Sequence, residues 1–216
     1  MKSTLFNMVA VLFGITLVAS AGVGVVNMIT VEPIAQAELT AKADALKQVL
    51  PPFDGTSDQT LTIDEIPVTV YTATRDGEVT GYAVESMSKN GFGGEVRRMV
   101  GCPPDGEVIN VIVLRQTETP GLGTKMADEG NVLRASIQGK NLEQMKLVDG
   151  KLAVRKDGGD VDALTAATIS SRAYVDAINR AYMAYRSVAR GVPATDVASG
   201  ASAQTGGDAR EGGENE

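Results

Sequence analysis

The chain has 216 residues, a formal net charge of −7 and no histidine. The lack of histidine excludes Ser-His-Asp and Cys-His catalysis, and the single cysteine, Cys102, excludes an internal disulfide and a cysteine-ligated iron–sulfur cluster. We therefore expect no catalytic side chain and no metal site, and any redox chemistry would need a bound organic cofactor.

The negative charge is concentrated at the C-terminal end of the chain. Residues 191–216 contain five acidic residues and one arginine, a net charge of −4, which leaves −3 of the total of −7 for the rest. This segment is rich in Gly, Ala and Ser and has no apolar periodicity, so it is predicted to be a disordered acidic tail. The sequence has no basic patch of the kind that binds nucleic acid, so no nucleic-acid partner is expected.

An apolar segment near the N-terminus predicts a membrane span. Leu5–Ile29 contains no charged residue, and its 25 positions exceed the roughly 20 residues that cross a bilayer. A signal peptide cleaved near Ala35-Gln36-Ala37 is the alternative, but the apolar core of a signal peptide is only about 7–15 residues long. The length favours a retained span, so residues 1–32 are interpreted as a short N-terminus and a transmembrane helix.

Charges on the two sides of this segment predict its orientation. Lys2 and the amino terminus precede it, whereas Glu32 and Glu38 follow it before the next lysine, Lys42. Because positively charged flanks tend to remain in the cytoplasm, we expect a single-pass protein of the cell inner (plasma) membrane. Its N-terminus would be cytoplasmic, and its soluble domain would lie on the periplasmic or outer side.

Residues 33–53 are predicted to form a stalk. Pro33 should end or kink the membrane helix. From Ile34 to Val49, alanines recur at four-residue spacing beside leucines, which indicates a helix, and Pro51-Pro52 stops it.

Asp-Gly pairs divide the next part of the chain into predicted hairpins, because this dipeptide between β-rich runs is a strong turn signal. The predicted strand pairs are Val68–Thr74 with Val79–Ser86, Val96–Val100 with Val108–Gln116, and Met145–Val148 with Lys151–Val154. The run Val108–Leu114 is almost continuously apolar and is therefore predicted to be the central strand.

Two helices complete the predicted domain of residues 54–190. A short helix is expected at Ala127–Ile137, weakened by Gly130, and a long helix from about Ser170 to Ala189. The long helix has a small-residue face and arginines that indicate partial solvation: Ala173, Ala177, Ala181 and Ala184, and Arg172, Arg180, Arg186 and Arg190. The predicted fold class is α+β, with a single N-terminal transmembrane helix and an antiparallel sheet whose flanking helices pack at its edges or on one face.

The stretch Asp162–Ser171 combines a carboxylate, hydroxyls and small residues just before the long helix. Small residues allow close backbone approach, and hydroxyls and amides at a helix start can bind phosphate oxygens. A threonine hydroxyl there could also be esterified to a phosphate. A plain capped helix is the alternative, because Ser and Thr are ordinary N-cap residues.

Two further motifs precede this stretch, namely Gly91-Phe92-Gly93-Gly94 and Glu118-Thr119-Pro120-Gly121-Leu122-Gly123. In order and spacing, the three resemble the FMN-binding domain of the G subunit of the Rnf electron-transport complex, whose flavinylation motif is Asp-x-x-Ser/Thr-Gly/Ala-Ala-Thr-x-Ser/Thr. The resemblance covers nearly the whole chain up to about Gly191. The sequence departs from the commoner pattern at Ala166, where Gly is more frequent.

The resemblance implies that FMN is attached to Thr168 through a phosphoester bond. It implies cofactor contacts at Thr165, Ala166, Ala167, Ile169, Ser170, Glu118, Thr119, Gly121, Leu122 and Gly123. Leu122 and Phe92 would lie near the ring, Thr119 or Lys125 would make polar contacts, and the hydroxyls of Ser170 and Ser171 would bond phosphate oxygens. Asp162 would either be recognised by a separate flavin transferase that uses FAD and Mg²⁺ or be an exposed turn carboxylate.

The function that the resemblance implies is electron relay within the Rnf ferredoxin:NAD⁺ oxidoreductase, coupled to translocation of Na⁺ or H⁺. The partners would be the other membrane subunits of the complex, and the chain would perform no independent catalysis. It has no glycine fingerprint for a dinucleotide, so no direct nicotinamide binding is expected. The alternatives are the C subunit of the Na⁺-translocating NADH:quinone reductase, a stand-alone flavinylated carrier, and a cofactor-free membrane-anchored binding module.

Overall fold

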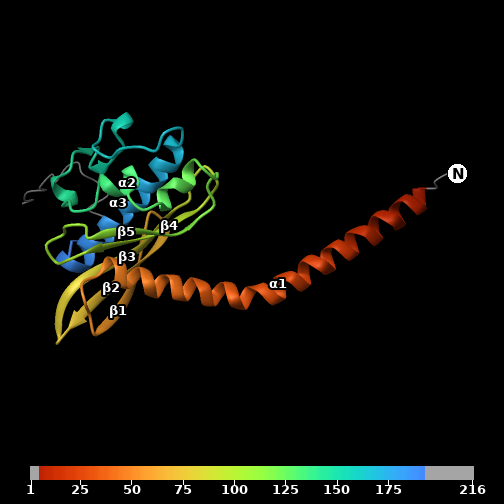
Figure 1. The fold of residues 1–216 in the computed structure, drawn as a ribbon, viewed down its shortest axis with the longest axis horizontal. Helices are drawn as coiled ribbons and strands as arrows, with labels where there is room; N and C mark the ends of the chain where they lie inside the picture. Colours follow the sequence, from red (N-terminus) through yellow and green to blue (C-terminus); the bar gives the residue numbers. More distant parts are fainter. Residues whose placement is uncertain (1–4, 193–216) are drawn as a thin grey trace, which may run out of the picture. The chain divides into compact units, whose positions relative to one another are not determined.

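The computed structural model describes residues 5–192. Lys2 and all but the first two residues of the predicted acidic tail at 191–216 lie outside the described residues. The chain divides into two compact units, Met1–Lys47 and Gln48–Glu216. Figure 1 shows the order of the elements along the chain.

A single helix, α1 (Leu5–Val49), runs through the first unit. Pro33 lies inside it, so the helix does not end there, and Figure 1 shows a change of direction near the middle of α1. This agrees with a kink, because a proline removes one helical hydrogen bond. The helix is long and apolar enough to cross a membrane, and the apolar side chains of its N-terminal part are exposed.

The second unit contains a five-stranded antiparallel sheet in the order β1-β2-β3-β4-β5 (Figure 1). The strands are β1 (Gly55–Ile63), β2 (Ile66–Arg75), β3 (Glu78–Ser88), β4 (Val96–Cys102) and β5 (Asn110–Gln116). The first two predicted hairpins are confirmed as the pairs β2–β3 and β4–β5. In the β2–β3 turn, Asp76 and Gly77 both have positive φ, 53° and 84°, as the tight hairpin turn requires.

The edge strand β1 was not predicted from the sequence. It pairs with β2 through a turn formed by Asp64 and Glu65, both of which have positive φ (49° and 62°). A non-glycine residue is uncommon in this conformation, so the turn lacks the Asp-Gly signal that marks the β2–β3 hairpin. Most of β1 is also exposed, so no clear apolar alternation identifies it.

The predicted central position of Val108–Leu114 is wrong. This run supplies most of β5, which lies at one edge of the sheet, whereas β3 lies at the centre. Val108 precedes the strand, and Ile112, Val113 and Leu114 are only partly buried. The pattern failed because apolar content reports burial and does not specify which neighbours a strand pairs with.

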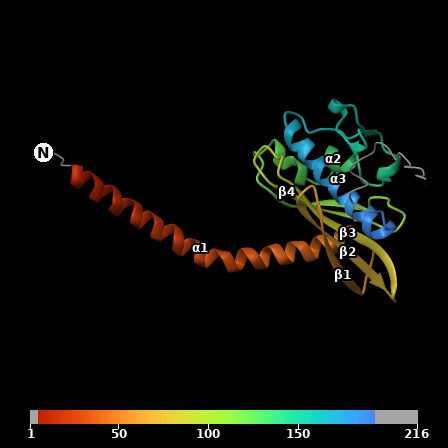
Figure 2. The ribbon, with the colours of Figure 1, turned by 180° about the vertical axis from the view of Figure 1, so that it is seen from behind.

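The long helix α3 (Thr168–Arg190) lies across one face of the sheet, packed mainly on β3 and also on β2 and β4 (Figure 2). All four alanines of its predicted small-residue face are buried. They allow close approach to the strand: Ser86 Oγ on β3 donates a hydrogen bond of 2.8 Å to the carbonyl of Ala177. The predicted packing of a helix on one face is confirmed, but Arg180 is buried and not partly solvated.

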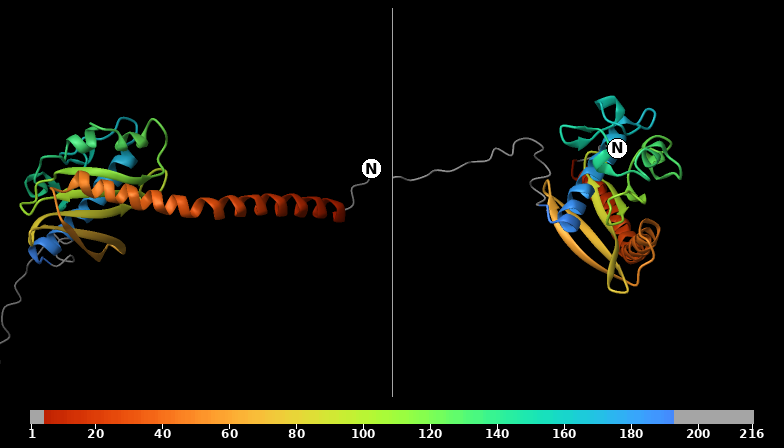
Figure 3. Two further views of the ribbon diagram at one scale, coloured as in Figure 1. Left: turned by 60° about the horizontal axis from the view of Figure 1, so that its bottom comes forward. Right: turned by 90° about the vertical axis from the view of Figure 1, so that its left-hand side faces the viewer.

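Short elements connect β5 to α3. They are η1 (Gly123–Ala127), α2 (Val132–Ala135), η2 (Leu142–Gln144), the antiparallel pair β6 (Leu147–Val148) and β7 (Lys151–Leu152), and η3 (Arg155–Asp157). The third predicted hairpin is thus confirmed with shorter strands. The helix predicted at Ala127–Ile137 is limited to α2, because Gly130 has a φ of 72° and Asn131 caps the helix start after it. Figure 3 shows these green and teal segments gathered away from the β1–β2 hairpin.

Cys102 is the last residue of β4 and is buried, which raises the pKa of its thiol to about 12. Because the thiolate is the reactive form, we expect the folded protein to resist alkylation by iodoacetamide at pH 8. Unfolding in guanidinium should allow complete modification, which mass spectrometry would measure. Rapid alkylation of the native protein would contradict this expectation.

Candidate functional site

Three segments that are distant in the sequence form one pocket of about 330 Å³ in the second unit. Its lining comes from the β3–β4 loop, the segment after β5 and the start of α3: Phe92, Glu118, Thr119, Leu122, Gly123, Ala166, Ala167, Thr168, Ile169 and Ser170. Of the residues predicted for the site, Thr165 and Gly121 do not line this pocket, and both are exposed. Gly121 instead shapes the turn after Pro120, with a φ of 76°.

Thr168 is the first residue of α3, two residues before the predicted helix start at about Ser170. The N-cap is Ala167, and no side chain caps this end of the helix, so the alternative of a plain Ser- or Thr-capped helix is wrong. The amides of the first turn and the positive end of the helix dipole therefore remain available to an anion.

Lys156 lies beside Thr168 and was not predicted as a site residue. Its Nζ donates a hydrogen bond of 3.1 Å to Thr168 Oγ1. The next residue, Asp157, ties this turn to α3 by accepting two hydrogen bonds of 2.7 and 2.6 Å from Arg172. These bonds lower the pKa of the Asp157 carboxyl, so the carboxyl is ionised at neutral pH. The available signal in the sequence was the basic pair Arg155-Lys156 shortly before the threonine motif.

Glu118 brings a buried carboxylate to the pocket, with 5% of its surface exposed. Its Oε2 accepts a hydrogen bond of 2.7 Å from Ser170 Oγ, whereas Oε1 has no hydrogen-bond partner among the described residues. Two glycines make room for this carboxylate. A Cβ at Gly91 would lie 2.5 Å from Oε1, and one at Gly123 would lie 2.6 Å from Oε2. Both flanking motifs therefore need glycine at these positions.

Three of the predicted polar contacts are not supported by the structure. The Ser170 hydroxyl donates its one proton to Glu118 Oε2, so it does not donate to a phosphate oxygen. Ser171 is buried, and its hydroxyl donates to the Ala167 carbonyl and accepts from the Leu164 amide, both at 2.9 Å. The prediction that Ser171 would bind phosphate oxygens is therefore wrong, because its hydroxyl instead fixes the turn before α3. Lys125 is exposed and does not line the pocket.

Asp162 lies outside the pocket. Its carboxylate pairs with Arg155 Nε at 2.5 Å and accepts a hydrogen bond of 3.3 Å from Ser136 Oγ. Its amide donates to the same hydroxyl at 3.0 Å. These contacts fix the segment that precedes the threonine motif, while 47% of the Asp162 side chain stays exposed. The geometry is compatible with both of the roles considered from the sequence.

Ala166 has a φ of 59°, a left-handed conformation that costs an alanine roughly 1–2 kcal/mol and costs a glycine much less. This strain explains why glycine is suited to the position. We expect Ala166→Gly to raise the free energy of unfolding by about 0.5–1 kcal/mol, measured by denaturant titration. Ala163→Gly is the matched control: its φ is not positive, so the same change should destabilise the protein. Equal effects of both substitutions would contradict the strain at Ala166.

The pocket fits a ligand with a phosphate at one end and a flat apolar part at the other. Lys156, Thr168 and the uncapped start of α3 provide the anion end. Apolar side chains stand at the pocket with large exposed fractions: Phe92 68%, Leu122 40% and Ile169 48%. A bound ring would cover these apolar surfaces. FMN has this combination of groups.

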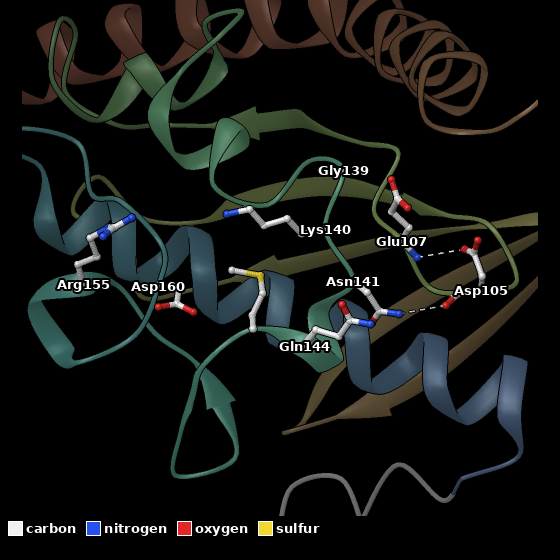
Figure 4. Close-up of a pocket in the computed structure, with 9 residues that line it drawn as sticks. Asp105, Glu107, Gly139, Lys140, Asn141, Gln144, Arg155 and Asp160 are labelled. Atoms are coloured by element: carbon white, nitrogen blue, oxygen red, sulfur yellow. Dashed lines mark hydrogen bonds between the residues drawn. The ribbon is translucent and has the colours of Figure 1, made fainter.

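A second pocket of about 510 Å³ lies apart from the three motifs (Figure 4). Its carboxylates, on Asp105, Glu107 and Asp160, are accompanied by the cations of Lys140 and Arg155, so it favours neither an anion nor a cation. Figure 4 shows two of its hydrogen bonds, from the Glu107 amide and from Asn141 Nδ2 to Asp105, each 3.2 Å long. The first bond closes a turn within the β4–β5 loop, and the second ties this loop to Asn141 at the start of η2; neither indicates a ligand.

Residues 91–183 match the family model of the FMN-binding domain. The matched region begins at the glycine-rich loop, includes the Glu118 motif and extends into α3. It therefore contains every segment that lines the 330 Å³ pocket.

Relatives that share one name match between 51% and 83% of the chain: each is the G subunit of an ion-translocating oxidoreductase complex. The protein of Shewanella loihica is 32% identical over 193 residues, which cover 83% of this chain and 89% of the relative. That of Vibrio cholerae is 35% identical over 173 residues, 76% of this chain and 82% of the relative. That of Haemophilus influenzae is 37% identical over 111 residues, 51% and 53% of the two chains. In the sequence, an FMN-binding domain follows a helix long enough to cross a membrane, and the similarity to these relatives extends over most of the chain. The chain therefore belongs to the family of G subunits of the ion-translocating oxidoreductase complex.

Proposed function

We propose that Thr168 carries FMN through a phosphoester bond to its Oγ1. The observation that supports this most directly is the place of that oxygen, at the uncapped N-terminus of α3, in a pocket, and 3.1 Å from Lys156 Nζ. A phosphodiester keeps one negative charge, which the ammonium group and the helix dipole both stabilise.

The other pocket residues act on the ring and on its access to water. Phe92, Leu122 and Ile169 offer apolar surface to the isoalloxazine ring, and Glu118 offers an acceptor oxygen. Bound FMN would supply the redox chemistry that this chain, without histidine and with one buried thiol, does not supply itself. The protein adjusts the reduction potential of the flavin only through such surrounding contacts.

We propose further that the chain relays electrons between cofactors of neighbouring subunits in an Rnf-type complex that translocates Na⁺ or H⁺. The relatives are named as subunits of an ion-translocating oxidoreductase complex, and the chain shares their FMN-binding domain. The role of a cofactor carrier fits this pocket, because its one lining carboxylate, Glu118, is buried and already accepts a hydrogen bond from Ser170. These names favour the Rnf-type G subunit over the C subunit of the NADH:quinone reductase.

The proposed orientation has α1 across the inner membrane and the flavin domain on its outer side. Covalent attachment suits this location, since a carrier outside the cytoplasm has no supply of free FMN to replace a lost cofactor. Proteolysis of spheroplasts tests the orientation. The second unit should be digested while the N-terminus is protected, and protection of the flavin domain would contradict it.

The attachment is tested on protein made in a host that expresses the flavin transferase. Intact-mass spectrometry should show one FMN phosphoryl adduct, and peptide mapping should place it within Asp162–Ser171. The denatured band should fluoresce under ultraviolet light in a gel. A bare polypeptide mass from such a host would support the cofactor-free binding module instead.

A further inference from the structure

Arg98 on β4 is a fully buried guanidinium with no hydrogen-bond partner. Its relative exposure is 0%, and none of its three side-chain nitrogens bonds to any described residue. The guanidinium carbon lies over the face of the Tyr174 ring on α3, 3.8 Å from the ring centroid. A cation over a ring face is stabilised, but by less than a paired carboxylate would give.

The nearby carboxylate is already occupied. Asp176 accepts hydrogen bonds from Ser88 at 2.5 Å, from Asn90 at 3.2 Å and from Arg180 at 2.5 Å. Arg180 also lies 3.6 Å from Asp64 Oδ2, so both of these carboxylates pair with Arg180, whereas no described residue forms a hydrogen bond with Arg98. Burial lowers the pKa of Arg98 to about 10, so its guanidinium is still charged at neutral pH.

The burial of this charge lowers the stability of the fold, and no hydrogen bond or ion pair of Arg98 with a described residue offsets that cost. A buried unpaired cation is unfavourable, and apolar residues of similar volume are often as stable or more stable in such places. Tyr174 adds to the cost, because its hydroxyl is also buried without a partner among the described residues. A cation kept under these conditions suggests an electrostatic role.

The charge lies close to the flavin pocket. Tyr174 is one helical turn beyond Ser170, which lines the pocket, and four residues span about 6 Å along a helix. β4 itself follows the loop that brings Phe92 to the same pocket. The low-dielectric core between the guanidinium and the pocket wall screens the charge much less than water would.

We propose that Arg98 raises the reduction potential of the flavin by stabilising the negative charge that arrives with an electron. The inference rests on the proposed function, since it requires FMN in this pocket. A unit charge on the order of 10 Å away, at an effective dielectric constant of about 20, changes a one-electron equilibrium roughly tenfold, or about 59 mV. Arg98 is thus a positioning charge for electron transfer and does not touch the reacting atoms.

The test compares Arg98→Met with Arg97→Met in the flavinylated full-length protein. Arg97 is the neighbouring residue on β4, and its side chain is 37% exposed and paired with Glu95 at 2.9 Å and with Glu85 at 3.5 Å. Both substitutions remove one positive charge from the same strand. Spectroelectrochemical titration should give a lower midpoint potential for Arg98→Met, equivalent to a roughly tenfold change, and the wild-type value for Arg97→Met.

Three outcomes separate the possibilities. A wild-type potential in flavinylated Arg98→Met, even with altered thermal stability, would reduce Arg98 to a packing role and overturn the inference. Arg98→Lys keeps the positive charge and should keep the wild-type potential. A lower midpoint potential in Arg98→Lys would also overturn the inference, and this measurement remains possible if Arg98→Met does not fold. Wild-type protein without any flavin would reject the proposed function itself, which the adduct mass reveals before any titration.

Discussion

Thr168→Val is expected to yield folded protein with no covalent flavin. Valine has nearly the shape of threonine but lacks the Oγ1 oxygen to which the phosphate would be esterified. The side chain lies at the start of α3, makes no capping bond, and accepts a hydrogen bond from the exposed Lys156, so the loss of its oxygen should hardly change stability. Intact-mass spectrometry and in-gel fluorescence should therefore change from complete to no adduct, while the unfolding midpoint stays within experimental error.

Thr165→Val provides the matched control for this experiment. Thr165 belongs to the same motif, but it is exposed and does not line the pocket. It should retain the adduct. A fluorescent Thr168→Val protein would show that the flavin is attached elsewhere.

Gly93→Ala should have the second largest effect, because it forces apart two of the segments that form the pocket. An added Cβ would lie 1.9 Å from the carbonyl oxygen of Thr117 and 3.0 Å from Cα of Glu118, and both are backbone atoms that cannot rotate away. The same contact includes a hydrogen bond of 2.8 Å from Thr117 Oγ1 to the Gly93 carbonyl. We expect a loss of roughly 1–3 kcal/mol of unfolding free energy and a strong decrease in flavin loading.

Gly55→Ala is the control for the glycine substitution. Its Cβ would meet only Thr74 Oγ1, at an ordinary 3.5 Å, on a strand far from the pocket in the sheet order. Thermal unfolding of both variants in detergent, together with the ratio of flavin to protein absorbance, measures the difference. Normal loading of Gly93→Ala would mean that the β3–β4 loop can move without harm to the site.

The sequence predicted those features of the fold that depend on neighbouring residues. The uncharged run Leu5–Ile29, the Asp-Gly turn at Asp76-Gly77 and the start of α3, to within two residues, were each visible in a short stretch of sequence. β1 was missed for the same reason: its turn uses Asp64 and Glu65, whose positive φ is set by strand pairing and not by a preference of the residues themselves.

The candidate site, too, was predicted only in part from the sequence. Motif spacing indicated which segments would take part, but it could not show that Ser170 bonds Glu118, that Ser171 is turned into the core, or that Lys156 reaches Thr168. Each of these contacts depends on how α3 packs against the neighbouring segments. The position of α3 in turn depends on packing across the whole domain.

By itself, the sequence determined a membrane-length helix, an α+β domain and the threonine at the start of its last helix, because chain composition, turn residues and helix periodicity are local properties. Only the tertiary structure decided that β3 and not β5 is central, that three loops enclose one pocket, and that Arg98 stands unpaired over Tyr174. These features arise from contacts between residues far apart in the chain, and their free energy depends on burial and on partners that no short stretch of sequence contains.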